Sequence, residues 1–350
     1  MPLSTFKFRP GVNTEITAYS NEGGWNDCDK VRFRFGFPEK LGGWIKYSLK
    51  TFLGVCRSLH AWIALDGSKF LGVGTHKKFY IVEGGAFNDI TPIRKTTTNA
   101  ATFAATNGST TITVTDSGHG AIVGDFVTFS GAATLGGNIT AAVLNIEYEI
   151  VTVPTANTYT KTTSVAANSS DSGNGGGSVV AKYQISVGID TVVPGTGWGA
   201  GTWGRGTWGS AATTVAGGGS IRIFSQDNFG EDLLFNIRDG SIYYWDRTNG
   251  LTTRAVELST LDSNAPTVAR KVLVSDRDRH VLVFGCNPIG SSTQDKLLIR
   301  FSSQENATDW LPSATNTAGD LVVGSGSQIV SVTETRREVF ILTDNSAHSL

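Results

Sequence analysis

The fold of this chain is decided by a unit that occurs twice, as Leu233-Leu-Phe-Asn-Ile-Arg-Asp-Gly-Ser-Ile-Tyr-Tyr-Trp-Asp246 and as Leu71-Gly-Val-Gly-Thr-His-Lys-Lys-Phe-Tyr-Ile-Val-Glu83. Each copy places an apolar run before a polar tip and an aromatic-rich run after it, which predicts an antiparallel hairpin. The run Glu338–Leu350 begins in the same way, and Lys271–Phe284 is a related hairpin around the tip Ser275–Arg279. Recurring hairpins of this kind are typical of β-propeller blades.

The rest of the chain also favours strands. No stretch has the 3.6-residue apolar period of a helix, whereas short apolar or alternating runs bounded by turn residues recur. Glycine accounts for 42 of the 350 residues, a larger share than the roughly 7% that is usual in proteins. Tight hairpin tips and close packing between blades would require many glycines. We therefore predict an all-β protein. Its host strands are predicted at Val31–Phe37, Leu59–Leu65, Phe79–Val82, Ile221–Phe224, Leu233–Ile237, Ile242–Trp245, Val272–Val274, Val281–Phe284, Leu297–Phe301 and Val339–Leu342.

Composition changes sharply in the middle of the chain. No arginine occurs between Arg94 and Arg205, and Thr96–Val187 is dominated by Thr, Ala, Gly, Ser and Val. This segment has strand-like runs of its own, and its stretch Asn168–Ser178 predicts a flexible loop. The domains are therefore predicted as follows: residues 1–95 begin a β-propeller-like host, residues 96–187 form an inserted small β-barrel or sandwich module, and residues 188–350 continue the host.

A Trp-Gly run at residues 195–209 fits neither the strand period nor the helix period. Trp198, Trp203 and Trp208 recur every five residues, with Arg205 between the last two. Because Trp and Arg are favoured at interaction hot spots, these four residues are the candidate interface or anchor residues. Two interpretations stay open, with packing on the protein or on a neighbouring subunit favoured over stacking on a sugar or other ligand.

The motifs predict no catalytic residue, metal site or cofactor. Ser275-Asp-Arg-Asp-Arg-His280 contains Asp-x-Asp but lies at a predicted hairpin tip, and the five histidines lack metal-ligand spacing. Gly72-Val-Gly74 is not followed by the remainder of a phosphate loop. Ser225-Gln-Asp-Asn-Phe-Gly230 resembles a sialidase Asp-box turn with the wrong spacing, and is predicted to be an ordinary turn. We therefore predict that the protein is not an enzyme, a glycan-cleaving propeller being the least favoured alternative.

Overall charge and hydropathy narrow the classes of partner. The formal net charge is −1, which argues against a dedicated nucleic-acid binder, since such proteins carry a basic surplus. No run approaches the ~18 apolar residues of a membrane-spanning helix. The three cysteines, Cys28, Cys56 and Cys286, are widely spaced and are predicted to be reduced and mostly buried.

Several blocks of the sequence resemble known families. The run Phe8–Asn13, the block Gly24–Trp44 and the stretch Ile299–Asp320 resemble large virion proteins of tailed bacteriophages, and among these the tail nozzle proteins of short-tailed phages, also called tail tubular or packaged-DNA stabilisation proteins. Within the insert, Ser117–Gly131 and Tyr148–Tyr159 resemble the small FCCH-type β-barrel module of ubiquitin-activating enzymes. That second resemblance implies a barrel fold for the insert and nothing about ubiquitin chemistry.

The nozzle resemblance implies a structural protein of the virion, located in the phage tail and assembled in the host cytoplasm. It implies a homo-oligomeric ring, with a hexamer favoured, that meets adaptor and portal-side tail proteins and tail fibre or needle proteins. Such a ring retains packaged DNA and conducts it during ejection without sequence-specific binding, and a near-neutral surface suits a conduit because a strongly basic one would trap a polyanion. The alternative is a receptor- or glycan-binding tail protein that uses the inserted module and the Trp-Gly run.

Overall fold

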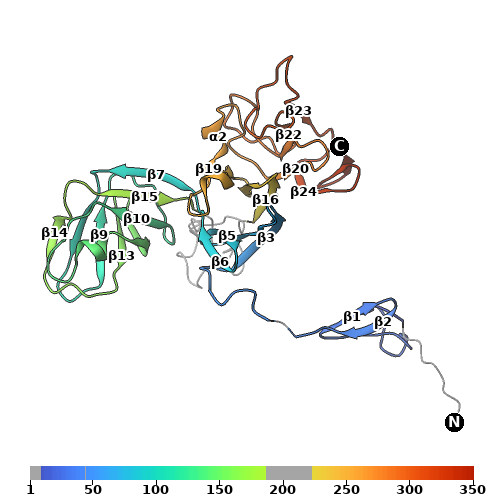
Figure 1. Ribbon diagram of the computed structural model, residues 1–350, viewed down its shortest axis with the longest axis horizontal. Helices are drawn as coiled ribbons and strands as arrows, with labels where there is room; N and C mark the ends of the chain where they lie inside the picture. Colours follow the sequence, from blue (N-terminus) through green and yellow to red (C-terminus); the bar gives the residue numbers. More distant parts are fainter. Residues whose placement is uncertain (1–8, 44, 187–222) are drawn as a thin grey trace, which may run out of the picture. The chain divides into compact units, whose positions relative to one another are not determined.

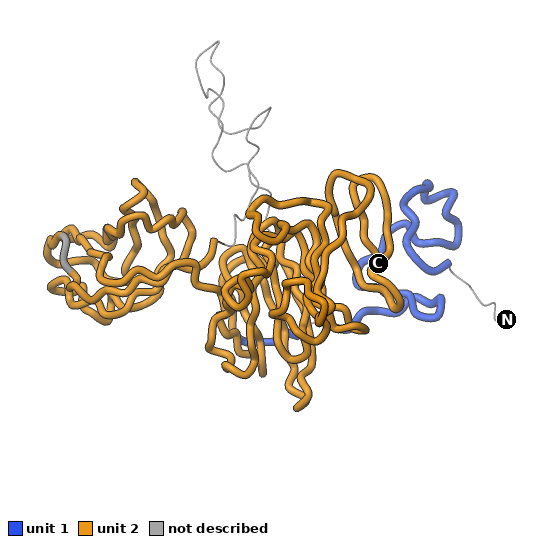
Figure 2. The backbone as a smooth tube through the Cα atoms, turned by 90° about the horizontal axis from the view of Figure 1, so that it is seen from above, with its two compact units in different colours: residues 1–49 blue, residues 50–350 orange. Residues whose placement is uncertain are grey.

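The computed structural model describes residues 9–43, 45–186 and 223–350 (Figure 1). The chain divides into two compact units, residues 1–49 and residues 50–350 (Figure 2). In the smaller unit, β1 (Val31–Arg34) and β2 (Phe37–Lys40) form an antiparallel hairpin. The sequence predicted one strand here, but Phe35 and Gly36 both adopt a positive φ, 50° and 83°. Two such residues in succession make the tight turn that suits the twist of a two-residue hairpin loop.

The larger unit confirms the all-β class with a propeller-like host. Three antiparallel sheets have four strands each in chain order, and a fourth sheet has three; we call them blades 1 to 4. Blade 1 contains β3 (Cys56–Ile63), β4 (Lys69–Thr75), β5 (Phe79–Glu83) and β6 (Ala86–Asp89). Blade 2 contains β16 (Phe224–Phe229), β17 (Asp232–Ile237), β18 (Ile242–Trp245) and β19 (Val256–Glu257). Blade 3 contains β20 (Lys271–Val274), β21 (Val281–Phe284), β22 (Leu298–Phe301) and β23 (Gly319–Val322). Blade 4 contains β24 (Ile329–Glu334), β25 (Val339–Thr343) and β26 (Ala347–Ser349).

Successive blades pack face to face through separate apolar clusters. The rings of Phe79 in blade 1 and Phe235 in blade 2 are stacked with centroids 3.9 Å apart. Further buried clusters join blade 2 to blade 3 and blade 3 to blade 4. The first strand of blade 2, β16, contacts the first strands of blades 1 and 3, β3 and β20, and β20 contacts β24 in blade 4. The first strands of the four blades therefore gather at one place, as the innermost strands of a propeller do.

Strands between blades 1 and 2 in the chain form two further sheets around their own buried cluster. One sheet has the order β11-β10-β15-β7 and the other β12-β13-β9-β8-β14, so this part of the chain is a small sandwich. Its strands are β7 (Ile93–Thr98), β8 (Thr102–Ala105), β9 (Thr111–Thr115), β10 (Phe126–Ser130), β11 (Glu147–Glu149), β12 (Thr152–Thr155), β13 (Thr158–Thr162), β14 (Asp171–Asn174) and β15 (Val180–Gln184).

The predicted flexible loop at Asn168–Ser178 instead contains β14, which pairs with β8. The described helices are short: α1 (Ala141–Leu144), α2 (Leu258–Leu261) and the 3-10 turn η1 (Arg247–Asn249). No helix in the described part of the chain is long and apolar enough to cross a membrane.

Candidate functional site

The structure describes only some of the residues that the sequence analysis selected as candidates. Trp198, Trp203, Trp208 and Arg205 lie outside the described residues, so their role stays a prediction. The stretch Ser225–Gly230 was predicted to be a turn, and this was wrong, because most of it belongs to the strand β16. Its polar residues misled the prediction, since they face a cavity rather than the solvent of a hairpin tip.

This cavity, which we call the central cavity, lies where the first strands of all four blades meet. Its volume is about 470 Å³. The lining comes from β3, β16, β20 and β24, and consists of Ser58, Leu59, His60, Phe224, Ser225, Gln226, Asp227, Lys271, Val272, Leu273, Val332, Thr333 and Glu334. Residues more than 250 positions apart in the sequence thus share one mostly polar space.

Asp227 links blades 1, 2 and 3 at the cavity. One carboxylate oxygen, Oδ2, accepts a hydrogen bond from the backbone N–H of Val274 at 2.9 Å, and the other lies 3.7 Å from Nε2 of His60. Burial raises the pKa of Asp227, and the Val274 N–H and the His60 ring partly oppose that rise. The cavity therefore holds an acid that is harder to ionise than an exposed aspartate.

A second acid, Glu334 of β24, lies in the same cavity. Its Oε1 accepts a hydrogen bond from the backbone N–H of Asp276 at 3.0 Å. Burial raises the pKa of Glu334, and the nearby carboxylates of Asp276, Asp227 and Asp278 raise it further. One side of the central cavity is therefore acidic. Among the described residues, no group of three or more His, Cys, Asp or Glu side chains is arranged to hold a metal ion.

A separate charged cluster joins the sandwich to the host. The side chain of Lys78 is only 2% exposed, and its Nζ lies 2.6 Å from Oδ2 of Asp89 and 2.5 Å from Oε1 of Glu147. Arg254 of blade 2 approaches the same two carboxylates, at 3.3 and 3.4 Å. Burial alone would raise the pKa of Asp89, but Lys78 and Arg254 hold it below its ordinary value. Nothing local in the sequence marks this cluster, because its members come from blade 1, from β11 of the sandwich and from the segment before β19 of blade 2.

The smaller unit presents a different kind of surface. Of its described residues only Asn21 is buried. Its large apolar side chains are exposed instead: Tyr19 98%, Phe35 89%, Phe37 64%, Ile45 93%, Tyr47 68% and Leu49 96%. The described part of this unit therefore has no apolar core of its own, and we call this set of exposed apolar side chains the N-terminal apolar surface.

The cysteines also differ from expectation. Only Cys286 is buried, whereas Cys28 is half-buried and Cys56 is exposed; all three are free thiols. Burial raises the pKa of Cys286 to about 12. This thiol is therefore an inert core residue rather than a reactive one.

The architecture defines an all-β chain of propeller-like blades that carries an inserted sandwich. No known protein family and no curated protein matches the sequence. One solved structure that matches is that of the phage phi92 endosialidase, at 12% sequence identity and a TM-score of 0.24, over 81% of this chain and 40% of that one. That protein, by its name, comes from a phage. At this distance no site or substrate is transferred from one chain to the other.

The match also corrects one prediction. The sequence motifs predicted that this protein is not an enzyme, but the matched protein is an endosialidase by name, and the prediction is withdrawn. Its physical basis was incomplete, because motif spacing detects only catalytic groups that are close in sequence. The central cavity shows how acids such as Asp227 and Glu334 come together from different blades with no such spacing.

Proposed function

We propose that this protein is a structural component of a bacteriophage tail and assembles through its N-terminal unit into a homo-oligomeric ring of the tail-nozzle type. The ring would sit below the portal and adaptor, retain packaged DNA and conduct it during ejection. The observation that carries this proposal is the N-terminal apolar surface. A preference for six copies comes from the sequence resemblance alone.

A unit that exposes its large apolar side chains is unfavourable in isolation. Burial of apolar surface stabilises a protein by about 25 cal/mol per Å², and this stabilisation is absent where the surface stays exposed. Phe35, Ile45 and Leu49 are each at least 89% exposed. Large unpartnered apolar surfaces on soluble proteins mark interaction sites. A second copy of the chain is the partner we favour, because head-to-tail contacts between identical chains close into rings.

Two other features support a structural role. The ion cluster around Lys78 ties the sandwich to the blades, which suits a building block of defined shape. The net charge of −1 suits a channel through which DNA must slide, since each additional phosphate contact strengthens binding.

The proposal is tested by the mass of the full chain in solution, from light scattering or native mass spectrometry. We expect an oligomer for the wild type and monomers for the double variant Phe35→Asn, Phe37→Thr, in which Asn tolerates the positive φ of residue 35. Val123→Thr, which changes an exposed apolar residue of the sandwich, is the control and should remain oligomeric. A wild-type chain that stays monomeric at high micromolar concentration would contradict the proposal.

A further inference from the structure

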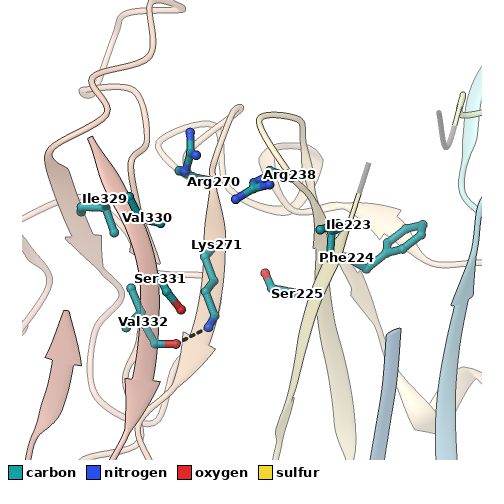
Figure 3. A pocket seen from close by; sticks show the side chains of 10 residues that line it. All are labelled: Ile223, Phe224, Ser225, Arg238, Arg270, Lys271, Ile329, Val330, Ser331 and Val332. Carbon is teal, nitrogen blue, oxygen red and sulfur yellow. Dashed lines mark hydrogen bonds between the residues drawn. The ribbon is translucent and has the colours of Figure 1, made fainter. Parts of the chain in front are cut away.

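A second, smaller cavity lies between blades 2, 3 and 4, and we call it the basic pocket. Its volume is about 160 Å³, which is room for about five water molecules at ~30 Å³ each. Figure 3 shows Arg238 reaching into it from the blade 2 side and Arg270 nearby at the start of β20, whereas Lys271 points away from both arginines, toward Val332 on the opposite wall. No carboxylate is among the ten described residues that line it.

The three cations of this pocket are incompletely neutralised. The guanidinium of Arg238 has no hydrogen bond or ion pair within the described part of the chain. Arg270 approaches only Asp239, at 3.6 Å, and Asp239 is also bonded by Gln294 at 3.1 Å. The Nε atom of Arg270 is buried and has no hydrogen-bond partner among the described residues. The ammonium of Lys271 donates to the carbonyl of Val332 and retains two further protons (Figure 3).

Buried guanidinium donors without acceptors cost free energy unless an anion supplies the missing bonds. The apolar walls, Ile223, Ile329 and Val332 among them, lower the local dielectric constant and strengthen any such bond. The planar fork of an arginine matches the oxygens of a phosphate group. Two guanidinium groups beside so small a space favour a dianion over a monoanion.

Comparison with the neighbouring central cavity indicates which of the two cavities an anion would enter. The two cavities share four lining residues, Phe224, Ser225, Lys271 and Val332. The acids Asp227 and Glu334 line only the central cavity. An anion is therefore repelled from the central cavity and attracted to the basic pocket.

We propose that the basic pocket binds a phosphate group, held by the guanidinium groups of Arg238 and Arg270. The group is either free phosphate or the terminal phosphate of a monoester, because the volume admits one such group. This inference does not depend on the proposed tail function.

The test is calorimetric titration of the full chain with inorganic phosphate, with glycerol phosphate and with acetate, at neutral pH and constant ionic strength. We expect saturable binding of one phosphate per chain at millimolar concentration or below, with acetate at least tenfold weaker. Tighter binding of glycerol phosphate would assign the site to a monoester, and tighter binding of inorganic phosphate to the free ion.

Arg238→Met should raise the phosphate Kd by about tenfold or more, because charge-assisted hydrogen bonds are lost. It should leave folding unchanged, because this side chain has no hydrogen bond or ion pair with the residues that the structure describes. Arg270→Met should act in the same direction. Arg277→Met is the matched control, because Arg277 lies on the β20–β21 tip with its side chain 78% exposed. The proposal is overturned if phosphate fails to saturate, or if Arg238→Met and Arg277→Met bind it equally.

Discussion

Lys78 of blade 1 and Glu147 of the inserted sandwich form an ion pair, with 2.5 Å between Nζ and Oε1, although they are 69 positions apart in the sequence. The lysine is buried, and its ammonium also lies 4.5 Å from the centroid of the Phe126 ring. Such a pair fixes the geometry of two sheets more than it adds stability, because desolvation offsets much of the attraction.

Loss of Lys78 should therefore be costly. Lys78→Met leaves Asp89 and Glu147 with Arg254 as the remaining cation, and we expect the free energy of unfolding to fall by about 3 kcal/mol. Denaturant unfolding followed by tryptophan fluorescence measures this. Lys77→Met is the control, because its partly exposed pair with Glu149 at 2.8 Å should contribute about 1 kcal/mol or less. Equal losses in the two variants would argue against a special role for Lys78.

Lys161 occupies the core of the sandwich. It is fully buried, and its Nζ lies 4.8, 4.4 and 3.8 Å from the ring centroids of Phe103, Phe129 and Tyr148. It has no hydrogen-bond partner within the described residues. Burial lowers the pKa of Lys161 from 10.5 to about 7, because the attraction of the rings offsets only part of the lost hydration.

Stability should consequently rise with pH above neutrality. Between about pH 7 and 10 the unfolded chain holds a proton at Lys161 that the folded chain has lost, so the free energy of unfolding increases by up to about 1.4 kcal/mol per pH unit. From about pH 9 the rise is opposed, since burial raises the pKa of Cys286 to about 12. Above pH 10 the effect reverses, since burial also raises the pKa of Tyr159 and Tyr183. Urea unfolding across this range should show the rise in the wild type and its loss in Lys161→Met. A rise that persists in the variant would assign it to other groups.

Gly74 tests the close packing of blades 1 and 2. A Cβ atom at this position would lie 2.6 Å from Cδ2 of Phe224 and 2.6 Å from Oγ of Ser58. Gly74→Ala should therefore lower the free energy of unfolding by about 1–3 kcal/mol through overpacking. Gly324→Ala, where a Cβ meets nothing within 4 Å, should be neutral or slightly stabilising in the same thermal or denaturant unfolding assay. A harmless Gly74→Ala would show that the interface is looser than the structure indicates.

The sequence predicted the blades better than the site. The hairpins at Leu71–Glu83 and Leu233–Asp246 form as expected, because short apolar runs bounded by turn residues are typical of strands that are buried on both faces. A strand was predicted at Ile221–Phe224, whereas β16 spans Phe224–Phe229. The prediction ended too early because Ser225 and Asp227 are polar and yet line the central cavity. Their partners are backbone groups of β20, and pairing with a distant strand leaves no local pattern.

The sequence also failed to predict the β1–β2 hairpin of the smaller unit and the two charged clusters. The turn at Phe35-Gly36 lies within an apolar run that reads as a continuous strand. The basic pocket and the Lys78 cluster each bring together residues that are far apart in the sequence, so only the tertiary structure reveals them. The boundaries proposed at residues 96 and 187, and the role of the Trp-Gly run, remain predictions.

A cryo-electron microscopy map of the phage particle proposed to contain this chain would decide whether the chain forms a ring in the tail. The account predicts several copies arranged as a ring around the tail axis, with the N-terminal apolar surface of each copy covered by its neighbour. A map that shows single copies on the outside of the particle, away from the axis and with this surface uncovered, would contradict it.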